Sequence, residues 1–260
     1  MVSTSFIDLS ISIENGVKSD PDRYLPTVEY VNHDDSSKDL VDFFPGISPE
    51  DMPNGEAWAL EKVSLTTHNG THLDAPYHYG SKMLDGSPTM TIDEVPLEWC
   101  FKPAVKLDFT SKANGYVVTA KDVEKELDRI EHELSPLEIV LMNTSAGELF
   151  GKDEYVNSGC GFGREATLYL LEKGVKVTGT DAWSWDAPFI YTAEKYAGSR
   201  DASIIWEGHK TGLEIQYCHL EKLHNLNLLP DKGFMVSCFP TKIKGGSAGW
   251  TRAVAIIETI

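Results

Sequence analysis

Short apolar runs and period-two alternation dominate the hydrophobic pattern of this chain. Residues 6–13 alternate apolar and polar side chains, which predicts a half-buried strand. Residues 138–143 begin with a glutamate and continue as an apolar run, which predicts a buried strand. The same reasoning predicts strands at residues 57–67, 103–107, 175–179, 234–239 and 253–257.

Two segments have the apolar spacing that is typical of helices. Residues 119–133 place valine, leucine and isoleucine at this spacing behind Thr119, which we expect to be the N-cap. Residues 164–173 carry a lysine in their last turn and precede Gly174, a common helix stop. The mixture of strands and helices has no regular strand–helix alternation. We therefore predict an α/β fold with a strand-rich core.

Residues 14–55 interrupt this pattern with many Asp, Pro, Asn and Gly residues. We interpret them as a long excursion with little regular structure, apart from a short helix near residues 36–44. Long loops in compact proteins are more often functional than idle. Because the chain shows no internal repeat or linker, we expect residues 1–260 to form a single domain that includes this excursion.

The charge balance excludes two classes of partner. The 260 residues carry 23 basic and 40 acidic side chains, a formal net charge of −17. A nucleic-acid-binding protein needs basic surface to replace phosphate counterions, and docking on an anionic membrane needs a basic cluster. The four cysteines form no disulfide-like framework, and no apolar run reaches the roughly 20 residues of a membrane span. We expect a cytoplasmic protein that binds neither nucleic acid nor membrane.

The segment with the clearest chemistry is residues 67–78, Thr-His-Asn-Gly-Thr-His-Leu-Asp-Ala-Pro-Tyr-His. Three of the eight histidines of the chain, His68, His72 and His78, fall here together with Asp74. Imidazole nitrogen and carboxylate oxygen are the usual protein ligands of Zn²⁺, and they also suit Mn²⁺. Their convergence predicts a metal site in preference to histidines that merely satisfy turns or the core.

Backbone geometry restricts how this segment can fold. The four residues are an even number of positions apart, so a strand would place them on one face. A straight strand from His68 to Asp74 would nevertheless span about 20 Å, too far for ligands of one ion. We therefore expect the chain to fold back at Asn69–Gly70, because glycine allows positive φ, and to bend again at Pro76. Gly70 and Pro76 disfavour a helix.

The motif His-x-Gly-Thr-His-x-Asp-x-Pro-x-His resembles that of the metal-dependent cyclase family. This family includes bacterial kynurenine formamidase, isatin hydrolase and related lactamases. Residues 7–10, 179–181, 240–245 and 251–253 resemble further segments of the family. The resemblance implies a swivelling β/β/α domain with a mixed, β-barrel-like core and flanking helices. It also implies a homodimer or homotetramer whose active sites are completed by a neighbour's loop, a role for which residues 14–55 are a candidate.

The resemblance assigns roles to the residues of the motif. It implies that His68, His72 and Asp74 bind a divalent ion and that His78 acts in acid/base catalysis. In the formamidase branch a second ion shares the aspartate and is held by a later histidine and a glutamate twelve residues further on. His209 and Glu221 stand at this spacing, which leaves one or two ions per chain open.

The other histidines of the chain do not match the family pattern. His219 and His224 flank Glu221, and we interpret them as surface or core residues. His33 and His132 look incidental, and His132 lies in a strongly charged helix end that we expect to be solvated.

The predicted chemistry is metal-dependent hydrolysis of an amide C–N bond, in a cyclic amide or an aryl formamide. A divalent ion makes hydroxide available and polarises a carbonyl, and His78 would transfer the proton. Alternatives are a lactone hydrolase or a cyclase/dehydratase that uses the same site, and a metal-binding protein without turnover. A pure binding protein would need the ligands but not a free His78.

The segment after residues 179–181 departs from the small aliphatic pattern of the family. It carries Trp183, Trp185 and Phe189, which suggest an aromatic-lined pocket for an aromatic or cyclic small molecule. Packing in the core or at a subunit interface is the alternative for these three side chains. A second departure is Trp250, which stands just before the closing Thr-Arg-Ala segment.

Overall fold

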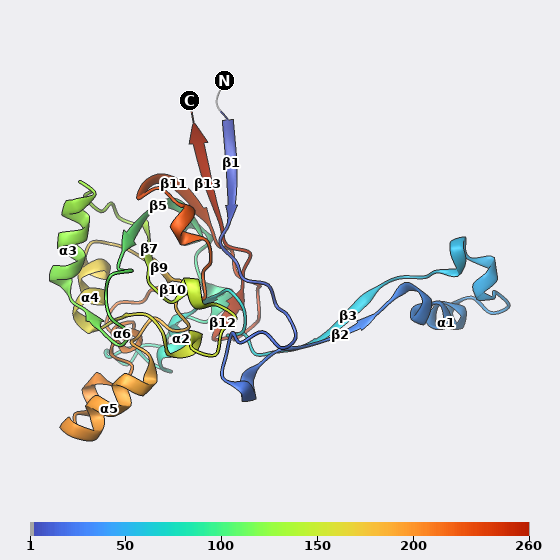
Figure 1. Ribbon diagram of the computed structural model, residues 1–260, viewed down its shortest axis with the longest axis horizontal. Coiled ribbons are helices and arrows are strands. Elements are labelled where there is room, and N and C mark those ends of the chain that lie inside the picture. The colour runs from blue at the N-terminus through green and yellow to red at the C-terminus, as the bar shows by residue number, and fades with distance from the viewer. Residues whose placement is uncertain (1–2, 260) are drawn as a thin grey trace.

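The computed structural model describes residues 3–259 and is built on one large mixed sheet (Figure 1). Its nine strands follow the order β1-β13-β11-β5-β7-β9-β10-β4-β12. The four strands β5, β7, β9 and β10 are mutually parallel, and the remaining pairs are antiparallel. The sheet curls into a half-barrel with helices packed outside it, which confirms the mixed α/β class.

The strands and helices have the following bounds. The large sheet consists of β1 Ser3–Asp8, β4 His72–Asp74, β5 Phe101–Asp108, β7 Ile139–Asn143, β9 Val177–Thr180, β10 Cys218–Glu221, β11 Lys232–Ser237, β12 Ala248–Trp250 and β13 Val254–Thr259. Two small sheets pair β2 Thr27–Val31 with β3 Leu60–Ser64, and β6 Val117–Val118 with β8 Gly161–Phe162. The helices are α1 His33–Phe43, α2 Pro76–Tyr79, α3 Ala120–Arg129, α4 Arg164–Glu172, α5 Phe189–Ser199 and α6 Glu207–Thr211.

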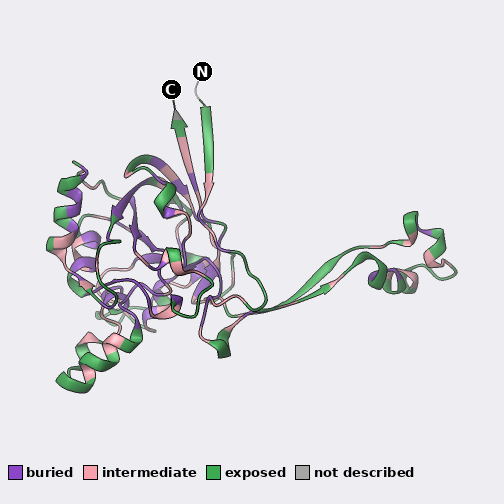
Figure 2. Cartoon of the chain, in the orientation of Figure 1, coloured by how far each residue is buried: buried purple, intermediate pink, exposed green. Residues whose placement is uncertain are grey.

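The hydrophobic core lies on both faces of the parallel strands, which are purple in Figure 2. Strand β7 shows this most clearly, since all five of its residues are buried. Ile139 and Leu141 join one apolar cluster, whereas Val140 and Met142 join the other together with side chains of α3 and α4. A strand covered on both faces needs apolar side chains at every position, which explains its continuous apolar run. No helix within residues 3–259 is both long and apolar enough to cross a membrane.

Helix α3 begins as the sequence predicts. The side chain of Thr119 accepts a hydrogen bond from the Asp122 amide, and the Asp122 carboxylate accepts from the Thr119 amide in return. This reciprocal cap satisfies amides that have no partner within the helix. Val123 and Leu127 of α3 are buried against the sheet. The helix ends at Arg129, four residues earlier than expected, and Glu131 follows with a φ of 50°.

Residues 27–64 form an arm that projects away from the body of the protein (Figure 1). Strands β2 and β3 pair antiparallel from Thr27–Ser64 to Val31–Leu60, and α1 lies near the tip of the arm. The helix expected at residues 36–44 is therefore α1, and the strand expected at 57–67 is β3. The excursion contains more regular structure than expected, because β2 lies within it and pairs with β3.

Candidate metal centre

Strand β4 places His72 and Asp74 between two neighbouring strands. His72 lies opposite Glu221 of β10, and Asp74 lies opposite His219. On its other side β4 pairs with β12. The preceding chain turns at Asn69 and Gly70, as expected, with a φ of 64° at Gly70. The Asn69 side chain fixes this turn, because its oxygen accepts from the Thr66 amide at 2.6 Å.

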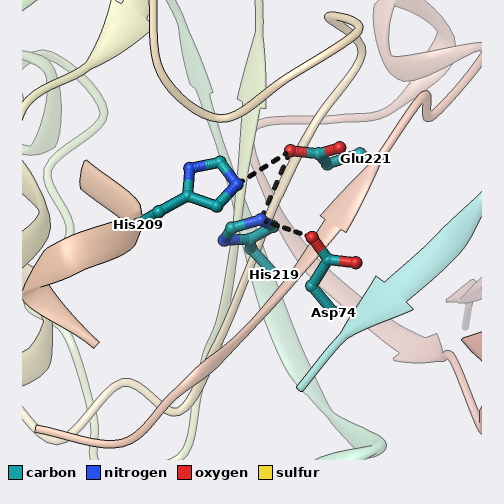
Figure 3. Close-up of side chains that lie close together, drawn as sticks. All are labelled: Asp74, His209, His219 and Glu221. Carbon is teal, nitrogen blue, oxygen red and sulfur yellow. Dashed lines mark hydrogen bonds and ion pairs between the residues drawn. The ribbon is translucent and has the colours of Figure 1, made fainter. Parts of the chain in front are cut away.

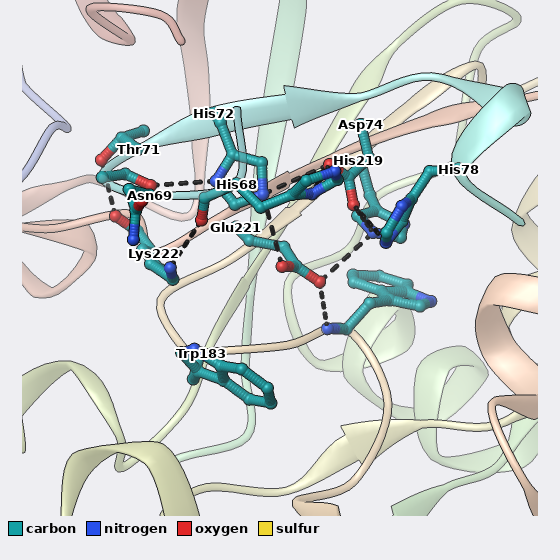
Figure 4. Close-up of polar contacts among 12 residues, drawn as sticks. His68, Asn69, Thr71, His72, Asp74, His78, Trp183, His219, Glu221 and Lys222 are labelled. Carbon is teal, nitrogen blue, oxygen red and sulfur yellow. Dashed lines mark hydrogen bonds and ion pairs between the residues drawn. The ribbon is translucent and has the colours of Figure 1, made fainter. Parts of the chain in front are cut away.

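The motif residues converge on the carboxylate of Asp74, which is fully buried (Figure 4). His68 Nδ1 lies 2.9 Å from Asp74 Oδ1, and His72 Nε2 lies 3.2 Å from the same oxygen. His78 Nε2 lies 3.7 Å from Asp74 Oδ2. His72 Nε2 is also 3.5 Å from Glu221 Oε2, so it lies between the carboxylates of Asp74 on β4 and Glu221 on β10.

The protonation of His72 follows from its neighbours. Its Nδ1 lies 2.9 Å from the carbonyl oxygen of Gly70, which can only accept, so Nδ1 carries the proton. The lone pair of Nε2 is then free. Nε2 and Asp74 Oδ1 are both buried. Neither has a hydrogen bond of good geometry among the described residues, although His68 Nδ1 lies 2.9 Å from Oδ1. Two buried acceptors side by side are costly unless a cation lies between them, so the donor set fits a divalent ion.

A second group of donors adjoins the first (Figure 3). Asp74, His209, His219 and Glu221 are all buried, and one donor atom of each lies within 4.8 Å of the others. Glu221 Oε1 is 3.6 Å from His209 Nε2 and 3.3 Å from His219 Nε2. His219 Nε2 also lies 3.1 Å from Asp74 Oδ2. One donor atom each of His68, Asp74 and His78 likewise lies within 4.8 Å of the others.

His209 is held by a carboxylate that the sequence analysis missed. Its Nδ1 donates to Asp186 Oδ2, which also accepts from the His209 amide at 3.0 Å. The other carboxylate oxygen of Asp186 accepts from the Gly208 amide at 2.8 Å. This arrangement fixes the proton on Nδ1 and directs the free Nε2 at Glu221, which is how carboxylates support metal-binding histidines.

His219 is the second residue that sequence reasoning missed. It is a core residue, but it lies inside the donor cluster rather than apart from it. Its Nδ1 is 3.2 Å from the hydroxyls of Tyr79 and Tyr217. The available signal was the alternation Cys-His-Leu-Glu at residues 218–221, which places His219 and Glu221 on one face of a strand.

The two carboxylates and the histidines around them shift one another's pKa values. Burial alone would raise the pKa of Asp74, but the neighbouring imidazoles of His68 and His78 lower it well below its usual range. Burial likewise opposes ionisation of Glu221, yet the hydrogen bond from His219 lowers its pKa to about 2. Burial would lower the pKa of His219, but Asp74 and Glu221 outweigh it and raise that pKa to about 9. The centre therefore holds two ionised carboxylates that favour positive charge.

His78 differs from the other histidines of the centre. It lies on α2, and its side chain keeps 22% of its surface exposed, whereas that of Asp74 is 0% exposed. Burial lowers the pKa of His78 to about 3 in spite of the attraction of Asp74. Its ring centroid is 4.0 Å from that of His68. His78 is therefore a neutral imidazole at physiological pH, able to accept a proton.

A cavity of about 370 Å³ opens onto the centre. His68, His78, His209 and Glu221 contribute to its wall on the side of the donors. The remaining lining side chains are Asp20, Tyr24, Thr66, Trp183, Ser184, Phe189, Trp206 and Lys222. A cavity of this size with an apolar wall and a few convergent polar groups is typical of a small-molecule site.

The three aromatic residues proposed for the pocket have different places. Trp183 and Phe189 line the cavity with their ring centroids 5.4 Å apart. Trp185 does not line it, since its ring is fully buried in the core and its indole N–H donates to Thr167 Oγ1 at 2.9 Å. Core packing, the alternative considered for all three, therefore describes Trp185. Trp250, the other departure, donates to the Thr66 carbonyl at 3.0 Å.

Trp206 is a further cavity residue that the sequence analysis did not identify. Its ring stacks on His209 at 4.4 Å and meets the ring of His78 edge-on at 5.0 Å. Its φ of 61° is uncommon for a bulky residue. Its buried indole nitrogen has no hydrogen-bond partner within the described part of the chain. Backbone strain of this kind is often found where function requires it.

The remaining histidines lie outside the centre. His132 is not simply solvated, because its Nε2 lies 2.9 Å from Glu138 Oε2. His224 is partly buried, and its ring lies 6.1 Å from that of Phe150. His33 is exposed at the start of α1.

Comparison with known proteins identifies the family. The model of the Cyclase family matches residues 7–187. The chain belongs to this family. It is 28% identical over 205 residues to kynurenine formamidase of Erythrobacter litoralis, an alignment that covers 78% of this chain and 79% of the relative. It is 28% identical over 216 residues to isatin hydrolase of Roseibium aggregatum, covering 78% and 77%.

Solved structures support the same relationship at the level of the fold. An isatin hydrolase bound to the product analogue thioisatinate superposes with a TM-score of 0.75. The two sequences are 21% identical, and the match covers 98% of this chain and 93% of that protein. The shared architecture confirms the fold that the motif implied.

Proposed function

We propose that this protein is a metal-dependent hydrolase of carbon–nitrogen bonds other than peptide bonds. The observation that carries this proposal is the placement of His78, a neutral imidazole beside a buried set of metal donors and facing a cavity. His68, His72 and Asp74 would hold one divalent ion, Mn²⁺ or Zn²⁺. His209 and Glu221 would hold a second together with Asp74, and His219 lies close enough to contribute.

A bound divalent ion would supply an activated water and polarise the carbonyl of the substrate. The residues of this chain perform the remaining tasks. His78 accepts the proton of the attacking water and delivers it to the departing nitrogen, so that the amine leaves without a negative charge. Trp206 packs against both His78 and His209 and limits the movement of their rings.

The substrate we propose is a small cyclic amide or an aryl formamide. Support comes from the aromatic wall of the cavity and from relatives named kynurenine formamidase and isatin hydrolase. Trp183 and Phe189 would contact the ring of the substrate, with their faces and edges offering the geometry that aromatic pairs prefer.

Metal analysis combined with activity assays tests this function. The purified protein should contain one or two Mn²⁺ or Zn²⁺ ions per chain and should hydrolyse N-formylkynurenine, isatin or a small lactam. The variant His78→Ala should lose turnover while its metal content stays nearly unchanged. If that variant also loses metal, His78 is a ligand rather than the acid/base group. Metal without hydrolysis of any amide would favour a lactone substrate or a binding protein.

We also propose that residues 1–260 act as one cytoplasmic unit that assembles into a homodimer or homotetramer. The arm of residues 27–64 supports this, because its β-hairpin and α1 extend from the body (Figure 1), and several of its large apolar side chains are exposed. These side chains include Tyr30, Phe43 and Phe44, each more than half exposed. Contiguous exposed apolar residues often mark an interaction surface. Sedimentation analysis should show a dimer or tetramer, and deletion of the arm should yield monomers.

A further inference from the structure

A buried lysine adjoins the metal centre. Lys222 directly follows Glu221, and its side chain is 1% exposed although it carries an ammonium group. Its Nζ donates to the carbonyl oxygen of His68 at 2.7 Å (Figure 4) and to the carboxylate of Asp20. Its φ of 58° turns the chain at the end of β10 and is uncommon for a lysine.

Asp20 is the counterion of this lysine, and it lies 202 positions earlier in the chain. Its carboxylate is buried and has three more donors. Trp183 Nε1 donates to Oδ1 at 3.0 Å, whereas Asn69 Nδ2 donates to Oδ2 at 2.9 Å and Ser19 Oγ at 3.0 Å. Asp20 therefore connects the segment before the arm with three parts of the site, namely the turn after His68, the aromatic wall and the end of β10.

Burying the charges of Lys222 and Asp20 costs free energy unless each charge is paired and hydrogen-bonded. An ammonium taken out of water is stable only when its charge is paired and its hydrogens are bonded. Removing one partner by mutation would leave the other as an uncompensated buried charge and would destabilise the folded protein. Both Asp20 and Lys222 line the cavity, and Lys222 reaches the backbone of the first proposed ligand directly.

We propose that Asp20 and Lys222 are positioning residues that hold His68 in the geometry required for metal binding and fix Trp183 in the cavity wall. The inference rests on the proposed metal-dependent function. Lys222 acts through the carbonyl of His68, and Asp20 acts through Lys222, Asn69 and Trp183. The segment around Asp20 is therefore part of the support of the site, although it contributes no ligand.

The first experiment compares two neighbouring aspartates in the full-length protein. Asp20→Asn removes the buried charge, and Asp22→Asn removes an exposed one, since the Asp22 side chain is 81% exposed and pairs with Lys18 at the surface. Zn²⁺ affinity is measured by competition with a chromogenic chelator. Loss of an outer-shell partner weakens metal binding about 10- to 100-fold, which we expect for Asp20→Asn. Asp22→Asn should bind zinc like the unchanged protein.

The outcomes separate this inference from the proposed function. If the unchanged protein binds no divalent ion, the proposed function fails. If it binds zinc and the two aspartate variants bind equally well, the function stands and the positioning role is refuted. Weaker binding by Asp20→Asn alone supports the positioning role, provided that the variant folds.

A double variant distinguishes positioning from general stability. Asp20→Asn combined with Lys222→Met leaves no uncompensated charge, so its melting temperature should exceed that of Asp20→Asn. Its zinc affinity should nevertheless stay about 10-fold or more below that of the unchanged protein, because the His68 carbonyl lacks its donor. Recovery of full zinc affinity in the double variant would overturn the proposal.

Amide hydrogen exchange on the unchanged protein tests the same coupling and does not depend on whether a variant folds. If Asp20 and Lys222 connect His68 to the segment around Asp20, zinc binding should protect that segment from amide hydrogen exchange, because coupling between two sites is reciprocal. We expect exchange in residues 17–24 to slow about 10-fold with zinc, while residues 40–50 in the arm keep their rates. Equal rates in residues 17–24 with and without zinc would refute the coupling.

Discussion

Replacing His78 by glutamine should reduce the loss of folding stability that the protein undergoes in acid. Burial keeps the pKa of His78 near 3 in the folded protein, whereas a histidine in the unfolded chain titrates near its ordinary value of about 6.5. Between these values the unfolded state binds a proton at this position and the folded state does not. Acidification through this range therefore favours unfolding. The lower the pH, the more His78 decreases the free energy of unfolding.

The size of the effect follows from the width of this window. Each pH unit below about 6.5 removes about 1.4 kcal/mol of stability through this one group. Lowering the pH from about 7 to about 5 should thus cost the unchanged protein about 2 kcal/mol more than His78→Gln. Glutamine keeps the size and polarity of the side chain, but it has no proton to bind in this range.

Urea unfolding at a series of pH values, followed by tryptophan fluorescence, measures this difference. A chelator is kept in every sample, because metal binding depends on pH in its own right. His33→Gln is the matched control, since His33 is exposed at the start of α1, and it should behave like the unchanged protein. If His78→Gln and the unchanged protein lose the same stability in acid, burial does not keep His78 neutral.

Three further predictions concern the second metal, the cavity and the core. Glu221→Gln keeps an acceptor for the Trp185 amide. It should reduce the bound metal from two ions per chain to one, as measured by atomic emission. A single ion in the unchanged protein would refute a two-metal site. Phe189→Ala should raise KM for an aromatic amide about 3- to 10-fold and leave KM for an aliphatic amide unchanged. Leu170→Ala should cost about 2–5 kcal/mol in urea unfolding, because Leu170 is 0% exposed in the core, and a loss below 1 kcal/mol would contradict tight packing there.

The parts of the fold that the sequence predicts are those with strong local patterns. The apolar run at residues 138–143 became β7, because a strand buried on both faces must be apolar throughout. The cap at Thr119 fixed the start of α3 for a similarly local reason. Helix α5 was missed because none of its residues is buried, so it has no apolar stripe that faces a core.

The motif of residues 68–78 and its turn at Gly70 were predictable for the same reason, since spacing and glycine act over a few residues. The composition of the full centre was not. His219 faces Asp74 only through the antiparallel register of β10 and β4, which are about 145 positions apart. Asp186 and His209 are 23 positions apart, and Asp20 and Lys222 are 202 apart, so neither pairing follows from a local pattern. Such contacts depend on how strands and loops meet in space, which no local pattern encodes.

The burial of Asp74 and Glu221 creates a need for a cation that does not depend on the identity of the substrate. The two carboxylates lie on adjacent strands, and their side chains are 0% and 8% exposed. Like charges at this depth repel one another and have lost their hydration, so they require positive charge nearby. The histidines supply part of it, and a divalent ion would supply the rest. This requirement is independent of any substrate, because it arises from β4 and β10 alone. The contacts that we propose for the substrate come instead from Trp183, Phe189 and Trp206, which line the cavity and belong to other segments of the chain.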